Sequence, residues 1–427
     1  VKSQQNPLTP WPNDPVSDAA HEVIYIRDDA TGDVWSATAK PVPVDDATYE
    51  VRHGKGYSVF THTAHGIDIQ STTCVPPHDS VKLTRLRLRN RSSGPRSLTL
   101  TAYVEWALAP NGASATPYIV TSIDGKTGAL FARNAWRAEF GERVAFIDFA
   151  GLQQSVSGDR AAFLGSAGTS AAPAAMRNSA ALDGRTGAAL DPCGALRMQL
   201  TLAPGHEYDA LFALGDAASV ELAQALVARC RALDFDAMLQ DVRTAWNALL
   251  DVVQVRTPDA ALDLMVNDWL LYQTLACRLW ARTAYYQASG AYGFRDQLQD
   301  VMALCVARPD ITREHLLRAA SRQFAEGDVQ HWWLPPAGQG LRTRMTDDRI
   351  WLPYVTARYL RATDDVAVLD ERVPFLAGAS LAEDQQDAFF EPAAGEAATL
   401  FEHCARAIDV SLSNGIHGLP LIGTGDW

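Results

Sequence analysis

The hydrophobic pattern of this sequence changes its period near Gly215, and this change limits the folds open to the chain more than any other feature. Before it, short runs such as residues 97–106 alternate apolar and polar side chains, the pattern of a strand with one buried face. After it, residues 217–250 carry apolar side chains three and four positions apart, as in amphipathic helices. We therefore predict a mixed β and α fold, with an N-terminal antiparallel β-sandwich followed by helices.

Two neighbouring runs in the first half suggest how strands pair. Residues 81–90 and 97–106 alternate in the same way, and a Ser-Ser-Gly-Pro segment joins them. Two alternating runs separated by turn residues predict a β-hairpin.

The length of 427 residues exceeds one ordinary hydrophobic core, so more than one domain is expected. Helical patterns continue over five further stretches: 258–282, 296–307, 311–325, 347–362 and 394–413. Paired helices with long loops at one end are typical of an α/α barrel, and about half of the helices of a complete barrel are predicted. The predicted domains are a β-sandwich over 1–218, a helical linker over 219–257 and the N-terminal half of an (α/α)6 barrel over 258–427.

Charge and cysteine content exclude several classes of function. The net charge is −13 and no basic stretch offers a face to phosphate backbones or anionic lipids, so we expect neither nucleic acid nor direct membrane contact. The six cysteines form no C-x-x-C pair, which indicates reduced thiols and a cytoplasmic location. No apolar run reaches the roughly 20 residues of a membrane helix, so a tether to the inner membrane would lie outside this sequence.

The ends of the sequence predict a fragment. The chain begins at Val1 rather than at Met, and it closes at Trp427 after an apolar, glycine-rich run. Natural termini are usually polar and exposed, so we expect the natural chain to continue.

The densest cluster of polar side chains lies at the start of a predicted helix, in the stretch AYGFRDQLQDVMAL. Asp296 and Asp300 are four residues apart and project from one helix face, and Arg295 precedes them. The helix dipole alone favours acidic residues near an N-terminus, so a solvated face is the simpler interpretation. The alternative is a site that binds sugar hydroxyls through charge-assisted hydrogen bonds.

A second cluster, HWWLPPAGQGLRTRMTDDRIW, combines two tryptophans with charged residues. Trp332 and Trp333 cannot both face one core on a helix, and the Pro and Gly residues after them predict a loop. The two indoles either pack in a core or an interface, or form a platform on which sugars stack. The charged side chains either form surface ion pairs or line a polar cleft: Arg342, Arg344, Asp347 and Asp348.

The last glycine-rich stretch, residues 414–427, would present His417, Asp426 and Trp427 on tight turns. Elsewhere the sequence contains no motif for zinc, for nucleotide phosphates or for a serine nucleophile. We therefore predict no metal and no nucleotide cofactor.

Three stretches, in this order, resemble the barrel motifs of family 94 glycoside phosphorylases: YGFRDQLQD, HWWLPPAGQGLRTRMTDD and HGLPLIGTGDW. Other stretches resemble the subgroup of that family fused into cyclic β-1,2-glucan synthases: NPLTPWPNDPVSDAAHEVIYIRD, RHGKGYSVFTHTAHGI, LTAYVEWAL and LFEHCARAID. The resemblance covers essentially the whole chain. It implies a β-sandwich, a helical linker and an (α/α)6 barrel.

The resemblance also implies an activity. Family members cleave a β-glucoside with inorganic phosphate as co-substrate and invert the anomeric centre to give α-glucose 1-phosphate. The subgroup implies a β-1,2-glucan oligosaccharide as the substrate, and related phosphorylases are often dimers, so a homodimer is one expected assembly.

Site residues follow from the resemblance by position. Arg295 and Asp300 match residues that hold the glucosyl unit, with Asp296 beside them. Trp427, next to Asp426, matches a tryptophan on the acceptor side. The general acid of the family would fall two residues beyond Trp427, so the catalytic residue is unknown here and this chain alone is expected to be inactive.

Other functions remain open. A free-standing β-1,2-oligoglucan or cellobiose-type phosphorylase shares these motifs. A non-catalytic carbohydrate-binding module would need no acid. A hydrolase on the same barrel would use a carboxylate such as Asp347 or Asp348 and would release glucose without phosphate.

Overall fold

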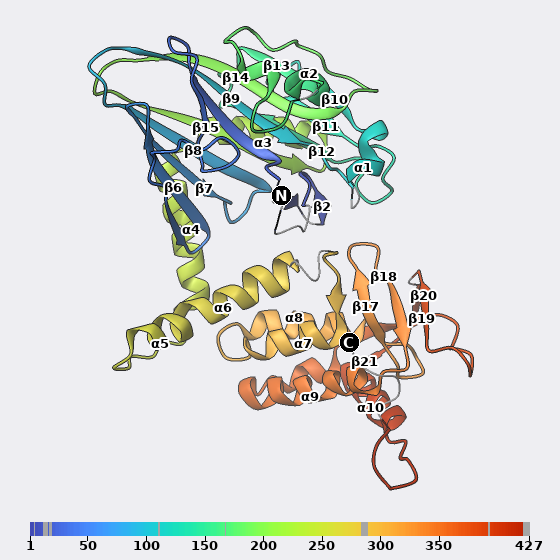
Figure 1. The fold of residues 1–427 in the computed structure, drawn as a ribbon. Coiled ribbons are helices and arrows are strands. Elements are labelled where there is room, and N and C mark those ends of the chain that lie inside the picture. The colour runs from blue at the N-terminus through green and yellow to red at the C-terminus, as the bar shows by residue number, and fades with distance from the viewer. Residues whose placement is uncertain are drawn as a thin grey trace. The chain divides into compact units, whose positions relative to one another are not determined.

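The computed structural model describes residues 1–3, 5–11, 16, 19–109, 112–166, 168–282, 289–391 and 393–421. The chain forms two compact units, Val1–Trp246 and Asn247–Trp427 (Figure 1). The finer division predicted from the sequence, with boundaries at residues 218 and 257, stays a prediction.

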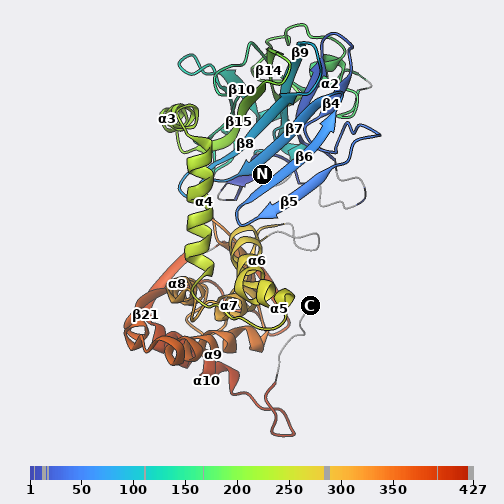
Figure 2. The ribbon, with the colours of Figure 1, turned by 90° about the vertical axis from the view of Figure 1, so that its left-hand side faces the viewer.

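The first unit is an antiparallel β-sandwich, which confirms that part of the predicted fold (Figure 2). Its larger sheet has the order β10-β11-β12-β15-β8-β7-β6-β5: β5 Glu50–Gly54, β6 Tyr57–Ala64, β7 Ile67–Cys74, β8 Val81–Asn90, β10 Val120–Ile123, β11 Leu130–Arg133, β12 Val144–Asp148 and β15 Glu207–Ala217. Its smaller sheet has the order β13-β14-β9-β3-β4: β3 Glu22–Asp28, β4 Val34–Ser36, β9 Arg96–Glu105, β13 Ser155–Asp159 and β14 Pro192–Leu202. Short elements complete the unit: β1 Lys2–Ser3, β2 Asn6–Pro7, α1 Gly112–Ala115, η1 Thr116–Tyr118, α2 Arg160–Leu164 and η2 Ala174–Met176.

The two sheets bury alternate side chains against each other. Leu86 and Leu88 of β8 and Leu98 and Leu100 of β9 are fully buried in one cluster, together with Trp35. Burial of each such leucine stabilises the fold by roughly 1.5–3 kcal/mol relative to exposure. The alternation in the sequence therefore reports the face of each strand correctly.

The predicted hairpin between residues 81–90 and 97–106 is wrong. Strand β8 pairs with β7 and β15, whereas β9 pairs with β3 and β14, so the two strands belong to different sheets. The link between them crosses the sandwich and is held by Asn90, whose Nδ2 donates to the carbonyls of Gly94 and Leu202, both at 2.8 Å. Alternation fits two facing strands as well as two paired ones, so it could not distinguish them.

Two helices follow the last strand of the sandwich: α3 Val220–Arg231 and α4 Phe235–Leu250. Ser219 caps α3 by accepting a hydrogen bond from the backbone N–H of Leu222 at 3.3 Å. Helix α3 packs on β12 and β15, where Val227 is buried in a cluster with Phe146. The larger sheet is thereby covered on the face opposite the sandwich core.

The second unit is mainly helical. A continuous helical segment with two π-helical stretches comes first: α5 Ala260–Leu264, η3 Met265–Trp269, α6 Leu270–Gln273 and η4 Thr274–Ala281. The later helices are α7 Phe294–Met302, α8 Pro309–Ala320, α9 Thr346–Thr363, η5 Val366–Asp370 and α10 Leu400–Ser411. Helix α9 packs against α7, α8 and α10 (Figure 1). A small sheet has the order β16-β17-β18-β20, and β19 pairs with β21: β16 Tyr292–Gly293, β17 Gln330–Leu334, β18 Gln339–Thr343, β19 Arg372–Ala377, β20 Asp387–Phe390 and β21 Ala393–Thr399.

Two local predictions for this unit are wrong. Trp332 and Trp333 lie in strand β17 rather than in a loop, because this strand pairs with both β16 and β18. The start of the predicted helix 394–413 is strand β21, and α10 begins only after Thr399, its N-cap. The alanines of β21 favour a helix locally, but pairing with β19 outweighs that preference.

Candidate functional site

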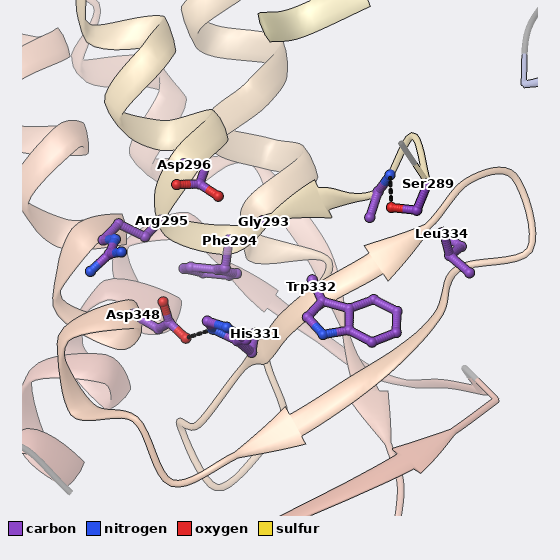
Figure 3. Close-up of a pocket in the computed structure, with 10 residues that line it drawn as sticks. Ser289, Gly293, Phe294, Arg295, Asp296, His331, Trp332, Leu334 and Asp348 are labelled. Atoms are coloured by element: carbon purple, nitrogen blue, oxygen red, sulfur yellow. Dashed lines mark hydrogen bonds and ion pairs between the residues drawn. The ribbon is translucent and has the colours of Figure 1, made fainter. Parts of the chain in front are cut away.

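A pocket of about 280 Å³ lies in the second unit (Figure 3). It is formed where α7 begins, by strand β17 and by the first turn of α9. Its lining residues are Ser289, Ala291, Gly293, Phe294, Arg295, Asp296, His331, Trp332, Leu334 and Asp348.

The start of α7 places a cation and a carboxylate at this pocket. Gly293 is the N-cap in an extended conformation, and a side chain there would collide with Asp296, since its Cβ would lie 2.3 Å from Oδ2. Asp296 lies in the first helical turn, where the helix dipole favours a negative charge. Arg295 forms an ion pair with Asp347 of α9 at 3.0 Å, which ties the start of one helix to the start of the other.

A hydrogen bond of 2.7 Å joins His331 Nδ1 to Asp348 Oδ2 across the pocket wall (Figure 3). Asp348 is buried, and this burial raises the pKa of its carboxyl, although the hydrogen bond from His331 opposes the shift. A buried carboxyl with a raised pKa holds a proton more readily than an exposed one. The pair therefore offers both a hydrogen-bond donor and an acceptor inside the pocket.

The two tryptophans of β17 have different positions. Trp332 is half-buried and lines the pocket, with its ring 6.1 Å from that of Phe389. Trp333 is buried behind the pocket, with its ring 5.4 Å from Tyr292 and 6.5 Å from Phe294. Trp333 thus packs in the core, whereas the sugar-stacking interpretation stays a prediction for Trp332, which lines the pocket.

A buried network supports the loop that leads into α7. Tyr292 lies between the guanidinium groups of Arg282 and Arg318, at 4.1 and 5.1 Å from its ring, and its hydroxyl accepts a hydrogen bond from each at 3.0 Å. His315 bonds to Gln297 of α7 through Nδ1 at 2.6 Å and accepts from Arg318 through Nε2 at 2.9 Å. These contacts fix the backbone that carries Arg295 and Asp296.

The structure brings together only some of the residues singled out in the sequence. Arg295, Asp296 and Trp332 line the pocket, whereas Trp333 lies behind it. Asp300 lies away from the pocket lining and pairs with Arg278, both carboxylate oxygens at 3.1 Å from Nε. Burial raises the pKa of Asp300, Arg278 opposes this, and Asp296 adds to it.

Two predicted site residues, Asp426 and Trp427, lie outside the described residues. Sequence reasoning also missed His331 as a pocket residue. A register shift of β17 between Gln330 and Trp332 breaks strict alternation, so His331 and Trp332 can line the same pocket. A histidine directly before a tryptophan pair was the available signal.

Among the described residues, no group of three or more His, Cys, Asp or Glu side chains is arranged to hold a metal ion. Within the same part of the chain, no helix is long and apolar enough to cross a membrane. The lining of the pocket offers one guanidinium, two carboxyls, an imidazole and an indole face. This combination suits a neutral polyol with apolar ring faces, such as a sugar.

A β-sandwich followed by a helical unit with a polar, aromatic pocket is the arrangement expected of carbohydrate-active proteins that combine a sandwich with an α/α barrel. The fold is similar to that of a bacterial glucoamylase solved with acarbose, with a TM-score of 0.55 and 10% identity over 82% of this chain and 53% of that one. A putative kojibiose phosphorylase from the human microbiome gives a TM-score of 0.52 and 10% identity over 82% of this chain and 46% of that one. The helical unit thus matches part of a glucoamylase-like (α/α)6 domain, as predicted.

Residues 1–233 match the supersandwich domain of glycosyl hydrolase 94, and residues 245–427 match the catalytic domain of the glycosyl hydrolase 94 superfamily. The chain belongs to this family of glycoside phosphorylases, as its motifs predicted.

Among relatives, the chain is 42% identical over all of its length to the cyclic β-(1,2)-glucan synthase NdvB of Rhizobium meliloti, of which it covers 15%. It is 27% identical to an N,N'-diacetylchitobiose phosphorylase of Vibrio furnissii, over 96% of this chain and 53% of that protein. It is 29% identical to a solabiose phosphorylase of Paenibacillus borealis, over 94% of this chain and 50% of that protein. The chain thus spans about half the length of these phosphorylases and a smaller part of the synthase.

Proposed function

We propose that the pocket around Arg295 and Trp332 binds the glucosyl end of a β-1,2-glucan oligosaccharide, for inverting phosphorolysis to α-glucose 1-phosphate within a cyclic β-1,2-glucan synthase. Two findings support this proposal. The pocket lies in the segment that matches the family's catalytic domain, and the whole chain is 42% identical to a synthase of that name. All six cysteines are free and five are buried, which supports the cytoplasmic location predicted from the sequence.

In this reaction the bond between the anomeric carbon and the bridging oxygen breaks, while a phosphate oxygen bonds to the anomeric carbon from the opposite face. The leaving oxygen takes a proton from a general acid. Phosphate is already a nucleophile, so no carboxylate is needed to activate water. By resemblance, the general acid is expected beyond Trp427, and the residues of this pocket bind and orient the sugar.

Each pocket side chain then has a role that its chemistry supports. Arg295 and Asp296 donate to and accept from sugar hydroxyls, and Trp332 packs against an apolar ring face. The His331–Asp348 pair holds a further hydroxyl, since its two groups keep fixed positions through their own 2.7 Å hydrogen bond. The observation that carries the proposal is the convergence of these five side chains, from α7, β17 and α9, on one pocket.

The test is a titration of the 427-residue chain with linear β-1,2-glucooligosaccharides, followed by an assay for glucose 1-phosphate after addition of phosphate. We expect saturable binding without turnover, and at least tenfold weaker binding by Asp296→Asn. Asp310→Asn is the matched control, because Asp310 occupies the first turn of α8 as Asp296 does that of α7, and forms an ion pair with Arg308, two residues before it. Absence of glucan binding, or equal binding by the two variants, would contradict the proposal.

Hydrolysis is a second candidate, favoured by one observation. Asp348 is a buried carboxyl in the pocket whose pKa is raised by burial, the property that a general acid needs. If Asp348 serves as the acid, the chain will release glucose from the oligosaccharide without phosphate, and Asp348→Asn will abolish the release. Release that depends on phosphate excludes this candidate.

A further inference from the structure

A stacked pair of aromatic side chains lies on the surface of the sandwich unit. The rings of Tyr118 and Trp136 are 4.4 Å apart and almost parallel, at 8°. The side chains are 41% and 74% exposed, and Trp136 is the most exposed tryptophan among the described residues. Tyr118 ends η1, which follows α1 at the corner labelled in Figure 1.

The backbone around this pair is fixed by buried contacts. Tyr118 is followed by Ile119, which is buried in the sandwich core, and Ala115 anchors the other end of the same segment. Asn134 is buried and accepts a hydrogen bond from the backbone N–H of Trp136 at 3.3 Å. Its Nδ2 donates to the carbonyl of Leu108 at 3.1 Å, which ties the loop of Trp136 to the segment that follows β9. A ligand that stacks here would therefore order little of the protein.

The chain segments that carry the pair also carry two charged groups, which form only a long ion pair with each other. Val120, two residues after Tyr118, pairs with Arg133 across β10 and β11. The guanidinium of Arg133 is half exposed and lies 3.9 Å from the exposed carboxylate of Glu142, on the loop that also carries Trp136. Both groups can turn toward hydroxyls at small cost, because an exposed ion pair of this length contributes little.

The fold itself does not account for the exposure of Trp136. Ile119 and Ala115 are buried in the core of the sandwich, whereas Trp136 belongs to no core cluster and is 74% exposed. A stable interface between two protein copies buries about 800 Å² on each partner, far more than two aromatic side chains offer. A flat aromatic surface with polar groups at its rim fits a narrow, extended ligand better.

We infer that Tyr118 and Trp136 form a second binding surface for a β-glucan chain, on the sandwich unit. The class of ligand rests on the proposed function. The outer face of the indole stacks on the apolar face of a glucosyl ring, and Arg133 and Glu142 meet its hydroxyls. A surface of this kind raises the local concentration of polymer around the enzyme, so it favours long chains over short ones.

The experiment measures binding of linear β-1,2-glucan by affinity electrophoresis of the 427-residue chain, which reports any site that a polymer occupies. Five chains are compared: wild type, Trp332→Ala, Trp136→Ala, Tyr118→Ala and Phe401→Ala. Phe401 is a matched control, since it is an exposed aromatic residue on α10 outside both sites. Thermal unfolding of each variant verifies that the fold is retained.

We expect Trp136→Ala to weaken retardation by polymer at least fivefold, Phe401→Ala to leave it unchanged, and Tyr118→Ala to weaken it as Trp136→Ala does. If Trp332→Ala weakens binding and Trp136→Ala does not, the second surface is refuted while the pocket proposal stands. If Trp136→Ala alone weakens binding, the second surface stands and the pocket proposal fails. A change in sedimentation of Trp136→Ala, without a change in glucan binding, would instead identify the pair as a contact between copies and overturn the inference.

Discussion

The sandwich unit and the helical unit differ in how completely they cover their large apolar side chains. In the sandwich, Trp35 and Phe146 are fully buried between or beside the sheets. In the helical unit, Leu264 is 61% exposed and Phe401 is 63% exposed, and further apolar residues of the segment 260–281 are in contact with solvent. The stability of the sandwich thus comes from its own core, whereas the site-bearing unit has less of its apolar surface covered within these residues.

The buried carboxyl groups of the two units also differ, in their partners and in their pKa values. In the sandwich, Asp148 pairs with Arg231 through two hydrogen bonds of 2.7 and 2.9 Å, and Asp216 pairs with Arg143 at 2.5 Å. In the helical unit, burial raises the pKa of Asp348 despite its partner. Paired carboxylates hold a scaffold together, and carboxyls with shifted pKa values gather where chemistry or binding takes place. By this comparison, the sandwich unit is the scaffold and the helical unit carries the candidate site.

The largest expected effect tests the core of the sandwich. Phe146→Ala should lower the stability of that unit by about 3–5 kcal/mol, because it leaves a cavity between β12 and helix α3. Urea unfolding followed by circular dichroism and tryptophan fluorescence should show the sandwich transition moving alone. The matched change Leu264→Ala, at an exposed position, should alter stability by no more than ~0.5 kcal/mol. A similar loss for both variants would mean that the two units differ less than their burial indicates.

The second effect concerns the loss of stability of each unit as the pH falls. Burial, with added repulsion from Arg318 and Arg282, lowers the pKa of His315 to about 3. A histidine with a depressed pKa stabilises the fold above its unfolded pKa of ~6.5 and loses this contribution as the pH falls toward the folded value, a loss of about 3 kcal/mol at pH 4. The sandwich has a comparable residue in His62, whose pKa burial lowers to about 4. The helical unit also contains His403, whose pKa is lowered by burial, so both buried histidines should reduce the stability of this unit as the pH falls from 7 to 4.

His315→Gln provides the measurement. Urea unfolding at pH 7 and at pH 4 should show a smaller pH dependence of the helical transition in this variant than in the wild-type chain. His206→Gln, at an exposed position of the sandwich, should leave the pH dependence of both transitions unchanged. An unchanged dependence in His315→Gln would show that this histidine is not the group that titrates.

The third effect tests whether glucan binding depends on Trp332, which lines the pocket, and not on its buried neighbour Trp333. Trp332→Ala should weaken the binding of short β-1,2-glucooligosaccharides about tenfold, or ~1.4 kcal/mol, because the indole lines the pocket. Since Trp332 is partly exposed, this change should lower the stability of the helical unit less than the loss of a fully buried indole would. Trp333→Phe, its buried neighbour, should instead lower the unfolding midpoint and leave affinity nearly unchanged. Isothermal titration and thermal unfolding of the two variants decide the matter, and a reversed pattern would contradict the placement of the two rings.

The sequence predicted the face of each strand better than the partners of the strands. Alternation in residues 81–90 and 97–106 is satisfied by two strands that face each other across the core as well as by a hairpin, and only the tertiary fold decides. The alanines of β21 favoured a helix for the same reason, since local preference does not include pairing with a strand 20 residues earlier in the chain.

The sequence likewise predicted some features of the candidate site and not others. Arg295, Asp296 and Trp332 were found because charged and aromatic residues cluster in short stretches of the sequence. His331 and Asp348 meet only because a strand with an irregular register lies beside the first turn of α9, at a separation of 17 residues. Such a pair has no periodic signal, so its hydrogen bond could be identified only in the folded chain.

The smallest expected effect tests the exposed apolar surface of the helical segment 260–281. Leu264→Glu and Leu270→Glu should reduce concentration-dependent self-association, as measured by sedimentation velocity, and should change the stability by no more than ~0.5 kcal/mol. Val51→Glu is the control from the sandwich, because Val51 is an exposed apolar residue on the edge strand β5. Reduced association only in the helical variants would mean that the apolar surface of this unit drives contact between copies, and would link the homodimer predicted from the sequence to this surface. Equal behaviour of all three variants would show that the exposed leucines have no part in association.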